Sequence, residues 1–177
     1  METHTLICHT DTPARTVDSI RVESERTGNG LWLRFHAELE LAKLRLPDPA
    51  EPDRTDGLWQ STCFEAFVRP QGRGEYSEFN FSPSSQWAAY LFASYRGGMA
   101  QLELTAPPPI YLDASEGHFA LESNIPSPNA AIQLALSAVI EETDGTRSYW
   151  ALAHPPGKPD FHHPTCFAAT LAAPQAS

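Results

Sequence analysis

The sequence predicts an all-β fold, an antiparallel β-sandwich of the jelly-roll or immunoglobulin-like type with about ten strands. Apolar and polar residues alternate with a period of two in many short segments. Turn-forming residues separate these segments, with 16 prolines and 10 glycines in 177 residues. No helical segments alternate with them, as a parallel sheet would require. We therefore expect a single domain over residues 1–177, with its core at about residues 17–171.

The first expected element is a hairpin with strands at residues 17–24 and 31–39. The sequence Thr-Gly-Asn-Gly at residues 27–30 connects them, and Gly and Asn accept the positive φ of a tight turn. Residues 46–57 follow, rich in Pro, Asp and Glu with almost nothing to bury. This segment predicts a surface loop, placed where it can flank a site.

A second antiparallel hairpin is expected from residues 63–68 and 76–82, joined by the turn at 71–74. Its alternation buries Phe64, Phe79 and Phe81 on one face. The opposite face is polar and carries Glu65, Glu78, Asn80 and Ser82. If the strands pair as the turn suggests, these polar side chains lie together on the sheet.

The remaining strands are expected at residues 87–95, 118–124, 132–141, 149–153 and 166–171. The segment 132–141 is ambiguous because its alanines and leucines also suit a helix. Its apolar residues nevertheless keep a period of two, which favours a strand. The aromatic segment 87–95 is interpreted as core packing, with its rings at Trp87, Tyr90, Phe92 and Tyr95.

Composition narrows the class of partner and the compartment. With 12 basic against 22 acidic residues, the formal net charge of −10 disfavours nucleic acid. No segment has the length and hydropathy of a signal peptide or a membrane span, so we expect no membrane association and a cytoplasmic location. The three cysteines, at positions 8, 63 and 166, have no CxxC spacing and favour reduced thiols over a disulfide framework or a zinc knuckle.

Two blocks of sequence carry a resemblance to a known family. The first is LWQSTCFEAFV at residues 58–68, followed by YSEFNFSP at residues 76–83. The second runs from Tyr149-Trp150 through a Pro-rich loop to FHHPTCF at residues 161–167. In this pattern the chain resembles the DOMON-like domains related to family 9 carbohydrate-binding modules.

The resemblance implies a β-sandwich that holds the end of a carbohydrate between two aromatic rings. Trp59 matches the first ring, and Phe161 stands where the family usually has a Trp. Glu65 matches the family's strand carboxylate, while Asn80 and Ser82 stand where those modules place an Arg and an Asn. Rings can stack on the apolar faces of a pyranose, and polar groups can reach its hydroxyls. The candidate ligand-binding residues are therefore Trp59, Gln60, Glu65, Asn80, Ser82, His154 and Phe161.

Three other interpretations remain open. A hydrolase would use Glu65 and Glu78 as a carboxyl pair. A haem site, known in some DOMON relatives, would need Met99, the one internal methionine, and a His partner. The group His154, His162, His163 and Cys166 suits zinc or copper chemically but lacks the spacing of a structural zinc motif. We expect a non-catalytic protein without catalytic residues, cofactor or metal, whose partner is a small molecule.

Overall fold

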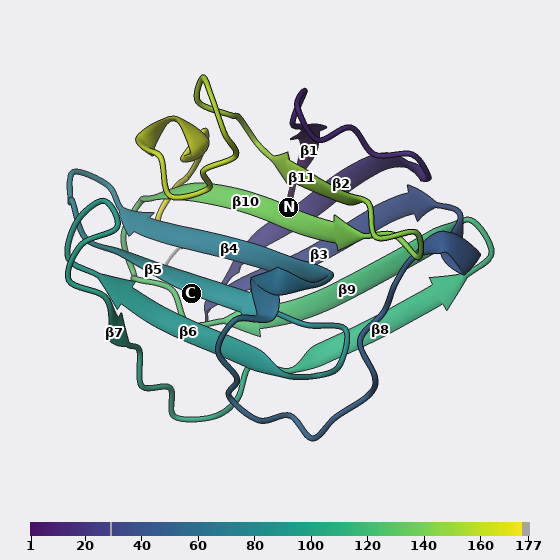
Figure 1. Cartoon of the computed structure of the whole chain (residues 1–177). Helices are drawn as coiled ribbons and strands as arrows, with labels where there is room; N and C mark the ends of the chain where they lie inside the picture. The colour runs from purple at the N-terminus through teal and green to yellow at the C-terminus, as the bar shows by residue number, and fades with distance from the viewer. Residues whose placement is uncertain (29, 175–177) are drawn as a thin grey trace.

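The computed structural model describes residues 1–28 and 30–174, so Asn29 of the predicted turn and residues 175–177 lie outside the described part. All of its long elements are strands (Figure 1). They are β1 (Glu2–Cys8), β2 (Val17–Thr27), β3 (Gly30–Leu39), β4 (Cys63–Pro70), β5 (Tyr76–Phe81), β6 (Trp87–Phe92), β7 (Ala100–Gln101), β8 (Ile110–Ser115), β9 (His118–Ile125), β10 (Ile132–Glu141), β11 (Arg147–Ala151) and β12 (Ala169–Leu171). Three short 3₁₀ helices accompany them: η1 (Leu41–Lys43), η2 (Leu58–Gln60) and η3 (Pro164–Cys166).

The predicted all-β, antiparallel class is confirmed, but two separate sheets are not. The strands form one continuous curled sheet in the order β7-β6-β5-β4-β10-β11-β1-β2-β3-β9-β8, and β12 pairs with β10. Its two halves lie as layers in front of and behind each other (Figure 1). β1 joins them, because residues 2–6 pair with β2 whereas Ile7 and Cys8 pair with β11. The sequence of β1 did not reveal this strand, since only Leu6 in it is buried.

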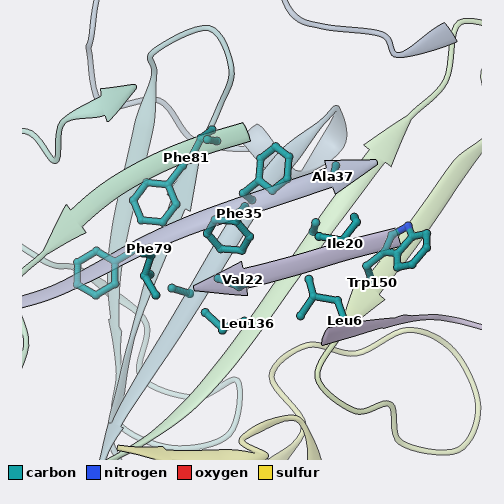
Figure 2. Packing of buried hydrophobic residues seen from close by; sticks show 14 of the residues in the cluster. Leu6, Ile20, Val22, Phe35, Ala37, Phe79, Phe81, Leu136 and Trp150 are labelled. Atoms are coloured by element: carbon teal, nitrogen blue, oxygen red, sulfur yellow. The ribbon is translucent and has the colours of Figure 1, made fainter. Parts of the chain in front are cut away.

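The main core fills the space between the two halves. Apolar residues that alternate along β2 and β3 face those of β4, β5 and β10. Figure 2 shows Val22 and Phe35 gathered with Phe79, Phe81 and Leu136. The rings of Phe35 and Phe64 meet across the halves, with centroids 5.2 Å apart. Because one face of each strand is closely packed in this core, every second residue of the strand is apolar, which is the alternation seen in the sequence.

Most predicted elements lie where expected. The ambiguous segment 132–141 is a strand, β10, and its position between β4 and β11 explains why nearly every residue in it is buried. Phe64, Phe79 and Phe81 are buried, and Glu65 pairs with Asn80 across β4 and β5 on the opposite face. Three other strands were not predicted: β7, β8 and the N-terminal β1.

Candidate functional site

A cavity of about 1080 Å³ lies on the face of β4, β5 and β6 that points away from the main core. Six side chains from neighbouring strands line it: Glu65, Glu78, Tyr90, Phe92, Val139 and Tyr149. Strand register explains the grouping, because Glu78 pairs with Tyr90 and Val139 pairs with Tyr149. Side chains that pair across strands point to the same face, so the sheet itself provides the floor of the cavity.

Part of the wall comes from the segment before β4. The loop predicted at residues 46–57 ends in η2, and Asp56, Gly57, Trp59 and Gln60 line the cavity. Gly57 precedes η2 with φ of 77°, where a Cβ would lie 2.9 Å from Nε2 of Gln60. The positive φ lies in the left-handed region that glycine adopts without strain, so Gly57 suits the turn into η2. Trp59 keeps 52% of its surface exposed, an unusual arrangement for a large aromatic ring.

A second part of the wall comes from the Pro-rich segment after β11, where Lys158, Pro159, Phe161 and His162 line the cavity. Side-chain contacts fix this segment. Arg96 donates to Asp160 at 2.7 Å, and the thiol of Cys166 donates to the Asp160 carbonyl at 3.2 Å. The sequence led us to expect a polar face here. Instead, the loop buries a second apolar cluster on this face of the sheet: Phe67, Tyr76, Ala88, Tyr90, Phe92, Ala135, Cys166 and Phe167.

Two buried carboxyl groups dominate the electrostatics of the floor. Glu65 accepts a hydrogen bond from Ser137 at 3.0 Å, and Glu78 accepts one from Asn80 at 2.8 Å. Burial and, secondarily, the neighbouring Glu78 raise the pKa of Glu65 to about 8. Burial also raises the pKa of Glu78. Both shifts follow from the cost of placing a charge away from water, to which the nearby Glu78 adds for Glu65.

His162 lies beside this pair as a neutral group. Desolvation and, after it, Arg96 lower its pKa to about 4. Its Nδ1 lies 2.8 Å from the hydroxyl of Tyr76, and its Nε2 lies 3.6 Å from a carboxyl oxygen of Glu78. Because the ring is uncharged near neutral pH, the contact with Glu78 is a polar contact and not an ion pair.

The hydroxyl of Tyr90 is also held in place at the edge of the floor. It donates a hydrogen bond to the carboxylate of Asp56, which anchors the loop before η2 to β6. Burial and this carboxylate raise the pKa of Tyr90. The phenol therefore stays protonated near neutral pH and keeps its partner.

Four of the seven candidate residues line the cavity: Trp59, Gln60, Glu65 and Phe161. The other three do not. Asn80 lies buried on the same face and orients Glu78, Ser82 binds Ser84 in the turn after β5, and His154 contacts the carbonyl of Ile7 at 2.8 Å. The predicted meeting of Trp59 and Phe161 at one cleft agrees with the structure, and contact of either ring with a ligand stays a prediction.

Sequence reasoning left several lining residues out, above all Tyr90, Arg96 and Tyr149. The interpretation of 87–95 as one core strand is corrected, because β6 ends at Phe92 and its two faces differ. Trp87 packs in the main core, whereas Tyr90 and Phe92 point to the opposite face and line the cavity. Tyr95 is 50% exposed. Alternation applied strictly to this strand would have separated these faces.

The candidate ligand side chains give little support to either a metal site or a haem site. Within residues 1–28 and 30–174, no three His, Cys, Asp or Glu side chains are grouped as metal ligands. His163 accepts from the Thr165 amide, and Cys166 donates to a carbonyl. Met99 and His162 share the cavity, but the two ring nitrogens of His162 face Tyr76 and Glu78. That ring does not fit as a haem ligand.

No helix in the described part of the chain has both the length and the apolar character needed to cross a membrane.

Comparison with known proteins shows the fold. No protein-family model matches the chain, and no curated protein matches it in sequence. A crystal structure from Bacteroides uniformis ATCC 8492, described as a putative carbohydrate-binding protein, is similar with a TM-score of 0.69 and 16% sequence identity. The match covers 97% of this chain and 85% of that one. This chain and the Bacteroides protein therefore share one all-β fold.

Proposed function

We propose that this chain is a non-catalytic small-ligand-binding domain that holds a carbohydrate in the cavity on the outer face of β4, β5 and β6. The observation that carries the proposal is the combination of an exposed Trp59 and the ring of Phe161 with buried hydrogen-bonding groups in one cavity. Aromatic faces suit the C–H faces of a pyranose, and carboxyl oxygens suit its hydroxyls. Cavities of this size and lining are the usual form of a small-molecule site.

Further observations support the same proposal. The Bacteroides structure with this fold is described as carbohydrate-binding. The resemblance to DOMON-like domains and family 9 carbohydrate-binding modules rests on Trp59 and Glu65, and both of these residues line the cavity. A cytoplasmic location belongs to the proposal too, because Cys8, Cys63 and Cys166 are all free thiols.

A thermal-shift screen against monosaccharides, cell-wall sugars and nucleotide sugars tests the proposal. A ligand at 100 times its Kd stabilises the folded protein by about 2.7 kcal/mol, which is readily measured. Calorimetric titration of the best ligand then compares Trp59→Ala with Tyr111→Ala. Tyr111 is the matched control because it is 64% exposed on β8, outside the cavity.

We expect Trp59→Ala to weaken binding about 30-fold, the loss of about 2 kcal/mol typical of an aromatic anchor that the ligand covers. Tyr111→Ala should leave the affinity unchanged. Equal affinity in both variants would show that the ligand binds outside this cavity. A screen in which no sugar stabilises the protein would contradict the carbohydrate proposal.

A hydrolase acting through Glu65 and Glu78 is the second candidate. Two buried carboxyl groups on one cavity favour it, since a protonated carboxyl can act as a general acid. Binding ranks first because the same cavity also offers the rings of Trp59 and Phe161 to a ligand. Release of the chromophore from nitrophenyl glycosides, abolished by Glu65→Gln or Glu78→Gln, would reverse this ranking.

A further inference from the structure

Each carboxyl group of the cavity floor has one oxygen held by the protein and one oxygen open. Ser137 donates to Oε2 of Glu65, and Asn80 donates to Oε1 of Glu78. Among the described residues, no donor lies within hydrogen-bonding distance of the other oxygen of Glu65. The second oxygen of Glu78 has only the 3.6 Å contact with His162. Yet Glu65 is 3% exposed and Glu78 6% exposed, and both line the cavity. Because both residues line the cavity, these open oxygens can accept hydrogen bonds from a ligand that supplies donors.

Few positive charges surround Glu65 and Glu78. Arg96 and Lys158 are the cationic side chains in the lining, against the acidic Asp56, Glu65 and Glu78. Arg96 is already engaged by Asp160, which lies 2.7 Å from its guanidinium. The whole chain carries a formal net charge of −10. An anionic ligand would meet repulsion here, whereas a cationic group would allow both buried carboxyl groups to ionise by offsetting the repulsion between them.

We infer that the ligand is an amino sugar with a free, protonated primary amine, which binds between the open oxygens of Glu65 and Glu78. An ammonium group has three N–H donors and no acceptor, matching a floor whose open polar atoms are carboxyl oxygens. Its bonds to carboxylates are charge-assisted, about twice as strong as those of a neutral hydroxyl. Glu65 and Glu78 lie diagonally on neighbouring strands, since Glu65 pairs with Asn80 and Phe67 with Glu78. Their long side chains can converge on a single amine. This inference rests on the proposed carbohydrate site and names the class of sugar.

The test is calorimetric titration of the full chain with four sugars of the same ring, each as a monosaccharide and as a β-1,4-linked disaccharide. Glucosamine carries the amine, N-acetylglucosamine has a neutral amide in its place, glucose has a hydroxyl there, and glucuronate carries a negative charge. We expect glucosamine to bind at least tenfold more tightly than glucose or N-acetylglucosamine, and glucuronate to bind most weakly. At pH 7, glucosamine should also release a proton, because the pKa of Glu65 of about 8 keeps that carboxyl protonated until the amine binds. Titrations in two buffers with different ionisation enthalpies measure this release.

Variants separate the charge from the shape of the floor. Glu65→Gln and Glu78→Gln keep the volume but remove the negative charge, so each should reduce the preference for glucosamine over glucose at least tenfold. Asp113→Asn on β8 is the matched control and should leave that preference intact, because Asp113 does not line the cavity. The melting temperature and circular dichroism of each variant confirm that it folds.

The outcomes distinguish the two proposals. The amino-sugar inference is overturned, while carbohydrate binding stands, if glucosamine and glucose bind equally well. The same holds if the protein prefers glucose, N-acetylglucosamine or glucuronate. A glucosamine preference that survives Glu65→Gln and Glu78→Gln also overturns it, since the amine would then be bound elsewhere. Absence of binding for all eight sugars, together with a negative general screen, overturns both.

Discussion

The two faces of β4 and β5 are both buried, but by different parts of the molecule. Phe64, Phe79 and Phe81 pack against the other half of the curled sheet, where regular strands meet regular strands. Glu65 and Glu78, on the reverse face, are covered by η2 and the loop after β11. Strands packed together leave no space for polar groups, whereas loops cover a sheet incompletely and leave a cavity. The difference shows how one hairpin can stabilise the fold with one face and shape a binding site with the other.

The largest expected effect is the loss of stability when a Phe on each face of the sheet is changed to Ala. Phe79→Ala should lower the free energy of unfolding by about 3–5 kcal/mol, because the ring is fully buried between the two halves. Phe92→Ala should cost about 2 kcal/mol, since that ring already borders a cavity and loses fewer contacts. Urea unfolding of both variants measures the difference. Equal losses would mean that the loops pack as tightly as the opposing sheet.

The second effect is a fall in stability as the pH rises through neutrality. The pKa of Glu65 is about 8 in the folded protein and ordinary in the unfolded chain. Between these values the folded state holds a proton that the unfolded state has lost, so unfolding releases it and stability falls with rising pH. The lowered pKa of His162 acts in the opposite sense, but only between about pH 4 and its ordinary value near 6.5.

The contribution of Glu65 is therefore clearest from about pH 6.5 to 8, at no more than about 1.4 kcal/mol per pH unit. Urea midpoints across this range measure it for the unmodified protein and for Glu65→Gln, which has no carboxyl to titrate. We expect the unmodified protein to lose stability and the variant to lose much less. Parallel curves would show that Glu65 is ionised at neutral pH, and the charged floor would have to be reconsidered.

The smallest effect concerns the loop that covers the outer face. Arg96→Met removes the pair with Asp160 while keeping most of the side-chain volume. The side chain of Arg96 is 53% exposed, so the loss should be only about 0.5–1 kcal/mol. Native-state proteolysis should nevertheless cut the segment 152–163 faster, because that pair fixes it. A loss above 2 kcal/mol would show that the loop stabilises the whole sheet and not the cavity alone.

Alternation made the core hairpins predictable, and the aromatic strand shows where the same reasoning was applied too loosely. In β6, Trp87 belongs to the main core and Tyr90 to the cavity, although only three positions separate them. β1 escaped because its single buried apolar residue, Leu6, gives no pattern. Arg96 carried no sequence signal at all, because its place in the cavity depends on a turn with φ of 50° after β6.

The sequence by itself determined the all-β class, the antiparallel hairpin of β4 and β5, and the shared face of Glu65 and Asn80, because period-two alternation is a local property of the strand. Only the tertiary structure decided that the strands form one curled sheet, since β1 joins the halves by pairing with strands far apart in the chain. It also decided which polar residues face the cavity. That choice depends on how the segments around Trp59 and Phe161, about 100 residues apart, fold over the same face, and such long-range contacts leave no periodic trace in either segment.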